Sequence, residues 1–239
     1  MPTLLDSVDA VFLDIGSTLV MGPPVSPNKE IVNHFGLSGD GAAAIGRMVM
    51  CTNFSGPEDV CRTLRQQGVS VGPVDSEFIS KLWSDQEAGA KPIEGALQAA
   101  EFLKISGKKL GLLSDIWSPY YRAFTRACPG IDALVEVRVL SFEAGLKKPD
   151  AAFFELAIAK CGVPPTRTLM VGDTYDRDIE PAMTAGMKAA WVLSRPEREV
   201  PALVGVIQGQ FSKPDITVAS IGDLQSATTK ENALADYGH

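Results

Sequence analysis

The sequence predicts an α/β protein: a Rossmann-like, doubly wound parallel sheet with an all-helical module inserted into it. Three observations support this fold class. Short apolar segments alternate with helical segments along most of the chain. Most of the apolar segments are almost continuously hydrophobic, which is typical of parallel strands that are covered on both faces. One long stretch, from about residue 21 to about residue 91, contains helical patterns and no convincing strand.

Six apolar segments are expected to form the strands of the sheet. They are residues 8–14, 109–114, 135–140, 168–172, 187–193 and 216–219.

Helical segments are expected between these strands. In one of them Phe154, Ala157 and Cys161 form an apolar stripe at helical spacing. Glycines past the segments or in their turns are expected where helices end, because the left-handed conformation of a C-cap suits glycine. The segments are residues 93–106, 120–127, 151–161 and 178–185, and the glycines are Gly107, Gly130, Gly162 and Gly186.

The stretch after the first strand is too long for a simple connection. A crossover between parallel strands rarely needs about 70 residues, so this stretch is interpreted as a separate helical module. Its expected helices are residues 28–35, 41–52, 57–67 and 75–88. We therefore expect a core made of residues 1–21 and 91–227, a helical module of residues 22–90, and a polar C-terminal tail of residues 228–239.

Composition and charge narrow the classes of partner. The net charge of −7 over 239 residues argues against a nucleic-acid partner, which would require a basic face. No apolar run approaches the ~18 residues that span a bilayer, and no signal peptide is evident at the N-terminus. The four cysteines are widely spaced, which favours reduced thiols in a cytoplasmic protein over disulfides or a zinc site. None of these observations predicts the oligomeric state.

Polar residues follow three of the predicted strands. Asp14 ends the first, Ser114 and Asp115 end the second, and Asp173 follows the fourth. Ligands bind in the crevice outside the carboxyl ends of the strands in an open parallel sheet. We therefore expect these side chains to face one another at a single edge.

These residue types suit the transfer of a phosphoryl group. A carboxylate such as Asp14 can attack phosphorus and form an aspartyl-phosphate. Asp173, Asp176 and Asp178 add carboxylates that would repel one another, and a magnesium ion would relieve that repulsion. Lys148 would pair with the nucleophile and with phosphoryl oxygens.

Four motifs in order resemble those of the haloacid dehalogenase-like superfamily of hydrolases, which are mostly phosphatases. The resemblance extends over roughly residues 8–225 and is weakest in the helical module, which would be the cap that follows the first motif. The motifs are Asp14-Ile15-Gly16-Ser17-Thr18, Leu112-Leu113-Ser114-Asp115, Gly145-Leu146-Lys147-Lys148-Pro149-Asp150, and Val171-Gly172-Asp173 with Asp178 five positions later.

The resemblance implies a role for each matched residue. Asp14 would be both nucleophile and metal ligand. The metal would be Mg²⁺, bound by Asp14, the Gly16 carbonyl, Asp173 and Asp178. The substrate would be a small phosphorylated molecule whose phosphate is held by Ser114, Asp115 and Lys148. Lys148 is chosen over Lys147 because the lysine of the family directly precedes the proline.

One position departs from the family pattern. Most family phosphatases have a second aspartate two residues after the nucleophile, as the acid that protonates the leaving alcohol, and here that position is Gly16. Positioned acid–base catalysis contributes roughly 10²–10⁴-fold. A phosphatase is favoured, either with a substrate whose leaving group needs little protonation or with a substitute acid such as Asp115, Tyr175 or His34. The alternatives are carbon–halogen or phosphorus–carbon cleavage, or a catalytically weakened hydrolase scaffold that serves as a binding or regulatory protein.

Overall fold

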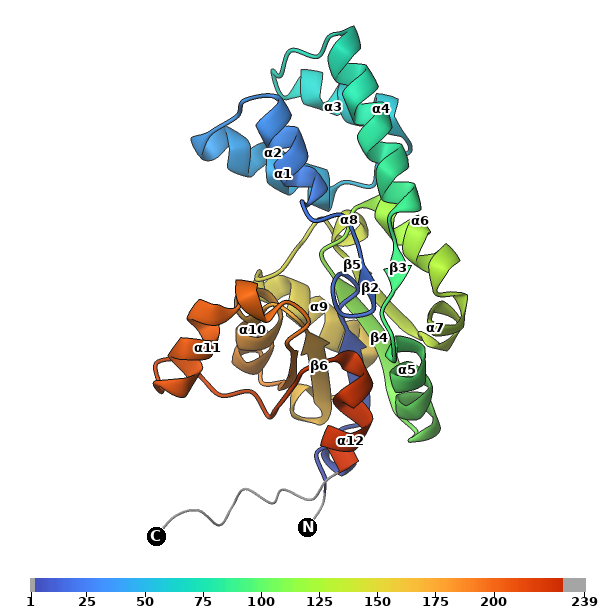
Figure 1. The fold of residues 1–239 in the computed structure, drawn as a ribbon, viewed down its shortest axis with the longest axis vertical. Helices are drawn as coiled ribbons and strands as arrows, with labels where there is room; N and C mark the ends of the chain where they lie inside the picture. The colour runs from blue at the N-terminus through green and yellow to red at the C-terminus, as the bar shows by residue number, and fades with distance from the viewer. Residues whose placement is uncertain (1–2, 230–239) are drawn as a thin grey trace.

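A computed structural model describes residues 3–229 of the chain, and its centre is a six-stranded sheet in which all strands are parallel (Figure 1). The strand order is β5-β4-β1-β6-β7-β8, so β1 lies between β4 and β6. The predicted α/β fold class is confirmed. The strands are β1 (Ala10–Leu13), β4 (Lys109–Ser114), β5 (Val137–Leu140), β6 (Thr168–Gly172), β7 (Lys188–Val192) and β8 (Ile216–Val218).

Alternate side chains of β1 pack on opposite faces of the sheet, which fixes the layers. Val11 and Leu13 belong to the cluster that includes residues of α5, α6 and α7, whereas Phe12 packs with residues of α9 and α10. A strand buried on both faces needs the continuous hydrophobicity that the sequence shows. The helices are α5 (Ala96–Ile105), α6 (Ser118–Ala127), α7 (Pro129–Leu134), α9 (Ala151–Cys161), α10 (Glu180–Thr184), α11 (Val200–Ile207) and α12 (Leu224–Thr229).

Residues 22–90, predicted to be the inserted module, contain four helices that lie together at one end of the molecule (Figure 1). A short antiparallel pair, β2 (Val20–Met21) with β3 (Lys91–Pro92), joins the two connections to the core. The module has its own apolar cluster, which takes in Trp117 from the core. The helices are α1 (Pro27–His34), α2 (Gly39–Cys51), α3 (Pro57–Gln66) and α4 (Pro73–Ala88).

Buried polar contacts connect this module to the core. The Ser141 hydroxyl, at the start of α8 (Ser141–Ala144), donates to the Met50 carbonyl at 2.7 Å. The Ser118 hydroxyl donates to the Phe54 carbonyl at 3.2 Å. Both bonds are buried, so separating the module from the core would break them and leave the Met50 and Phe54 carbonyls without these donors.

Several short elements are absent from the sequence-based expectation. The two-residue strands β2 and β3, the helices α7, α8, α11 and α12, and short helical turns were all missed. Gly130 was expected at a helix end and instead lies inside α7, whereas Gly107, Gly162 and Gly186 have the positive φ of a C-cap glycine. The turns are η1 (Leu5–Ser7), η2 (Pro165–Arg167), η3 (Tyr175–Ile179, π-helical), η4 (Pro196–Arg198) and η5 (Ile221–Asp223).

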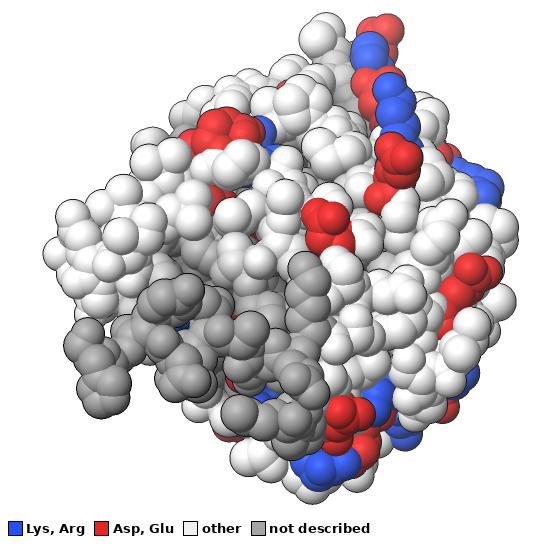
Figure 2. Space-filling view, turned by 60° about the horizontal axis from the view of Figure 1, so that its bottom comes forward, with Lys and Arg blue, Asp and Glu red and all other residues white. Residues whose placement is uncertain are grey.

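Four further findings concern the surface charge, the helices, the cysteines and the C-terminal residues. Figure 2 shows acidic and basic side chains interspersed on a mostly uncharged face. Among residues 3–229, no helix combines the length and the hydropathy required to cross a bilayer, and the four cysteines are free thiols. Of the polar tail predicted from residue 228, residues 228 and 229 lie in α12, and residues 230–239 lie outside the described part.

Candidate active site

The sheet brings the predicted site residues to the carboxyl ends of β1, β4 and β6. Leu13 is in register with Leu112 of β4 and with Val171 of β6. The amide of Asp14 continues the ladder by donating to the Val171 carbonyl at 2.9 Å. Since the strands are parallel, the residues that follow them all emerge at one edge of the sheet.

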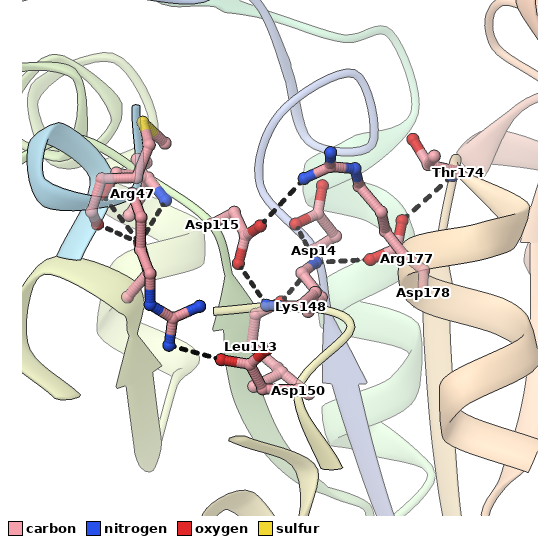
Figure 3. Close-up of polar contacts among 12 residues, drawn as sticks. Asp14, Arg47, Leu113, Asp115, Lys148, Asp150, Thr174, Arg177 and Asp178 are labelled. Atoms are coloured by element: carbon pink, nitrogen blue, oxygen red, sulfur yellow. Dashed lines mark hydrogen bonds and ion pairs between the residues drawn. The ribbon is translucent and has the colours of Figure 1, made fainter. Parts of the chain in front are cut away.

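Lys148 lies at the centre of a buried group of charges (Figure 3). Its ammonium donates to Asp14 Oδ1 at 2.7 Å, to Asp178 Oδ1, and to the Leu113 carbonyl at 3.1 Å. Lys148 and Asp178 are 2% exposed and Asp14 is 6% exposed, so these charges interact with little screening. The neighbouring Lys147 makes no ion pair among the described residues.

Asp173 is held by an arginine that the sequence analysis did not single out. Arg195, three residues beyond the end of β7, directs its guanidinium to Asp173 Oδ2, with its Nε at 3.0 Å. The indole of Trp191 donates to the Asp173 carbonyl at 3.1 Å, which fixes the backbone at this point. The signal that could have revealed Arg195 is the one used for Asp14 and Asp173, namely a charged residue just after a strand.

Burial and mutual repulsion change the proton affinity of these groups. Burial, and then the charges of Asp178 and Asp173, raise the pKa of Asp14 to about 7, against the lowering effect of Lys148. Burial and the charge of Asp178 raise the pKa of Asp173 to about 6, opposed by Arg195. The charges of Asp14 and Asp178 raise the pKa of Lys148, although burial acts in the opposite direction. The lysine therefore remains protonated at neutral pH.

The carboxylates fit a divalent cation. Asp14, Asp173 and Asp178 each offer an oxygen, and these oxygens lie within 4.8 Å of one another. Two cationic side chains contact the three carboxylates, so the cluster retains negative charge. Hard oxygen ligands with residual negative charge are what Mg²⁺ prefers. Gly16, the fourth predicted ligand, lines a cavity that Asp14, Asp173 and Asp178 also line.

A cavity of about 360 Å³ lies over this cluster, and we call it the main cavity. Lys148 and Asp115 line it, but Ser114 does not. Ser114 is 1% exposed and its hydroxyl has no hydrogen-bond partner among the described residues, so one buried donor at the end of β4 remains available. Basic residues that the sequence analysis did not assign also line the main cavity: Lys29, Arg177, Arg195 and Arg198.

Asp115 supports the loop that carries the lysine. Its Oδ1 accepts the Lys148 amide at 2.8 Å, and its Oδ2 lies 3.4 Å from Arg177 Nη1 (Figure 3). Burial raises the pKa of Asp115, although Lys148 and Arg177 oppose this. A carboxylate would repel a phosphate group, so any phosphate contact of this residue is expected from its backbone amide.

Two of the three suggested substitute acids do not line the main cavity. The Tyr175 hydroxyl donates to the Ser212 carbonyl at 2.7 Å. His34 lies in α1, pairs with Asp75 at 2.8 Å and stacks on Phe78. In this structure the side chains of Tyr175 and His34 make contacts elsewhere, so neither is placed to protonate a leaving group in the main cavity. Asp115 alone of the three borders the main cavity.

Comparisons with known proteins agree with this arrangement. A family model described as HAD-hydrolase-like matches residues 145–224. The pyrimidine 5'-nucleotidase YjjG of Escherichia coli is 28% identical over 140 residues, which cover 58% of this chain and 57% of that protein. A glyceraldehyde 3-phosphate phosphatase of Methanothermobacter thermautotrophicus is 37% identical over 93 residues, which cover 38% of this chain and 40% of that protein. The chain thus spans about half the length of the curated relatives it matches.

The fold is also found in solved structures. The crystal structure of a HAD phosphatase from Thermococcus onnurineus superposes with a TM-score of 0.60 at 17% identity, over 94% of this chain and 99% of that one. At this identity the likeness establishes the fold alone. The family model and the curated relatives support the resemblance of the chain to the haloacid dehalogenase-like superfamily of hydrolases.

Proposed function

We propose that this protein is a magnesium-dependent phosphatase of small phosphorylated metabolites, with Asp14 as its nucleophile. The observation that carries the proposal is the buried group in which Lys148 contacts Asp14 and Asp178, with Asp173 beside them. The two curated relatives compared above are named for phosphate monoesters with different leaving groups. The group that these substrates share is the phosphate. In this chain, the cluster of Asp14, Lys148, Asp173 and Asp178 is the group of residues suited to react with a phosphate.

The reaction follows from the groups present. The Asp14 carboxylate attacks phosphorus, the bond from phosphorus to the leaving oxygen breaks, and an aspartyl-phosphate forms. Water then attacks this intermediate, which releases phosphate and restores Asp14. Lys148 holds the Asp14 carboxylate in place and offers positive charge to the phosphoryl oxygens as negative charge develops on them. We propose that the unpaired hydroxyl of Ser114, buried at the end of β4, donates to one of these oxygens when the phosphate is bound.

Magnesium would be held by Asp14, Asp173 and Asp178, with the Gly16 carbonyl as a further oxygen. When bound, the ion supplies Lewis-acid stabilisation of negative charge and a template that orients the phosphate. The carboxylate cluster also argues against carbon–halogen cleavage, since the dehalogenase branch of the family needs no metal.

The leaving oxygen requires a proton that Gly16 cannot provide. A Cβ built on Gly16 meets no atom within 4 Å, so the place where the family's second aspartate would lie is open. Asp115 borders this space and its pKa is raised, so it is the remaining candidate acid. We infer that the preferred substrates have leaving groups that depart readily or that are protonated by Asp115.

Residues 22–90 would act as the cap that selects the substrate. The main cavity includes α1 residues such as Asn28 and Lys29 together with core residues, so part of its wall belongs to this module. A cap that closes over the bound substrate excludes bulk water from the reacting groups.

The experiment that tests the function is hydrolysis of p-nitrophenyl phosphate by the wild type and by Asp14→Asn. We expect turnover that requires Mg²⁺, stops with EDTA and is absent in the variant. A folded wild type that hydrolyses no phosphate ester in Mg²⁺ would favour the binding or regulatory alternative.

A further inference from the structure

A second, smaller cavity adjoins the main cavity on the side where α4 meets α6. We call it the side cavity; its volume is about 160 Å³. Gly16, Ser17, Asp115 and Arg195 line both cavities, so the two are continuous around the position of the missing second aspartate. A substrate whose phosphate lies at Asp14 would extend its leaving group in this direction.

The far wall of the side cavity carries polar groups without partners. It includes Gln86 of α4, Trp117 at the start of α6, and Tyr120 of α6. Their exposed fractions are 2%, 1% and 9%. The indole N–H of Trp117 and the hydroxyl of Tyr120 have no hydrogen-bond partner among the described residues, and no side-chain hydrogen bond is formed by Gln86 within this part of the chain. Buried polar atoms are normally paired, so two unpaired ones on one wall, with the Gln86 amide beside them, require an explanation.

The chemistry of these groups defines what would satisfy them. The indole is a donor only, a phenol donates and accepts, and an amide offers both kinds of group. Burial and the charge of Asp14 raise the pKa of Tyr120, so its hydroxyl remains protonated and able to donate. All three groups are uncharged. They match hydroxyl or carbonyl oxygens better than a carboxylate or an ammonium group.

The position of Tyr120 is tightly fixed. A Cβ added to Gly22 would overlap the Tyr120 hydroxyl and ring, so the chain between β2 and α1 packs directly against the phenol. Trp117 is held by an edge-to-face contact with Trp83, whose ring centroid is 5.1 Å away. Preorganised donors of this kind discriminate between ligands, because a ligand without matching oxygens leaves them unpaired.

The geometry points to the side cavity as a subsite for a short, uncharged, hydroxyl-bearing leaving group, bound by Gln86, Trp117 and Tyr120. The inference rests on the proposed phosphatase function and specifies its substrate class as phosphate monoesters of small polyols or sugars. The cavity is below the ~300–1,000 Å³ of sites for drug-sized ligands, which favours a leaving group of a few carbons.

The test compares two probes that differ only in hydroxyl groups, glycerol 3-phosphate and propyl phosphate. We expect a higher kcat/KM for glycerol 3-phosphate in the wild type. Tyr120→Phe should lower this value about 3- to 10-fold, the size of one neutral hydrogen bond, and should lower kcat/KM for propyl phosphate less. Gln86→Leu should act in the same direction. Gly22→Ala, which displaces the phenol, should also reduce the preference.

Tyr121→Phe is the matched control, since Tyr121 lies on the same helix and its hydroxyl accepts from Arg138 Nε at 3.1 Å, away from the side cavity. This variant should leave kcat/KM unchanged for both probes. Equal kcat/KM values for the two probes in the wild type would overturn the subsite. So would an equal loss of kcat/KM for both probes in Tyr120→Phe. So would a preference for 3-phosphoglycerate that Tyr120→Phe does not alter, because the rim residues Arg195 and Arg198 would then select a carboxylate.

Binding separates the failure of the subsite from the failure of the proposed function. The same probes are titrated by calorimetry into Asp14→Asn, with and without Tyr120→Phe. Tighter binding of glycerol 3-phosphate that depends on Tyr120 would support the subsite even if the wild type hydrolysed no ester. Equal binding of the two probes would reject it, whatever the catalytic result.

Discussion

The ammonium of Lys148 lies 2.7 Å from the Asp14 carboxylate, and less than a tenth of either side chain is exposed. These residues are 134 positions apart in the chain, so the fold itself brings them together. The same ammonium also contacts Asp178. One lysine therefore connects the residue after β1 with the turn after β6.

Removing this lysine should destabilise the protein as well as inactivate it. Lys148→Met leaves two buried carboxylates without their cation, and breaking such pairs costs about 3–5 kcal/mol in the free energy of unfolding. Chemical denaturation in metal-free buffer measures the loss. Lys147→Met is the control, and a change within about 0.5 kcal/mol is expected for it. Equal effects of the two substitutions would contradict the central place given to Lys148.

Gly16→Asp should improve catalysis rather than damage the fold. The added Cβ meets no atom within 4 Å, and Gly16 does not have a positive φ. If the missing acid limits the rate, we expect at least a tenfold rise in kcat for alkyl phosphates, within the roughly 10²–10⁴-fold that acid–base catalysis contributes. Gly16→Asn, of the same size but without a proton to transfer, should give no rise. A folded Gly16→Asp variant with unchanged kcat would show that the acid is supplied elsewhere.

Magnesium should stabilise the protein more at pH 7.5 than at pH 5.5. Folding raises the pKa of Asp14 to about 7 and that of Asp173 to about 6, from 3.8. The folded, metal-free protein therefore binds more protons than the unfolded chain, and these groups lower its unfolding free energy as pH rises from about 4 to about 7. A cation bound to the ionised carboxylates offsets this loss. Unfolding curves in EDTA and in Mg²⁺ measure it, and equal stabilisation at both pH values would contradict the carboxylate site.

Arg195→Gln should tighten magnesium binding. The guanidinium neutralises Asp173, one of the proposed ligands, so its removal leaves more negative charge for the ion. We expect a severalfold lower Kd for Mg²⁺ by calorimetry. Arg167→Gln, which removes an exposed pair with Asp9, is the control and should leave the Kd unchanged. Weaker binding in Arg195→Gln would show instead that the arginine positions Asp173 for the metal.

The sequence was sufficient for the parts of the fold that hydrophobic patterns determine. Each of the six predicted strands is present, and the four inner ones, β4, β1, β6 and β7, are the ones whose burial on both faces requires an uninterrupted apolar run. The residues after β1 and β6 could also be predicted to converge, because the carboxyl ends of parallel strands lie at one edge of the sheet. The two-residue strands β2 and β3 have no pattern long enough to detect.

Contacts made by side chains across the fold could not be predicted in this way. The pairing of Arg195 with Asp173 depends on the path of the chain after β7. The approach of Gly22 to Tyr120 depends on how the helical module meets α6. Both involve residues far apart in sequence. The position of Arg195 just after a strand marks it as a candidate, but its partner depends on the tertiary fold. The same holds for Tyr175, whose hydroxyl is committed to Ser212 by tertiary packing.

Capture of the covalent intermediate tests the central proposal most directly. The protein is quenched in acid during turnover of p-nitrophenyl phosphate with Mg²⁺, and its peptides are analysed by mass spectrometry. We predict one phosphoryl group on the peptide that contains Asp14 and none in the Asp14→Asn variant, which should also lack turnover. A phosphoryl group on another residue, or full activity of Asp14→Asn, would contradict the assignment of Asp14 as the nucleophile.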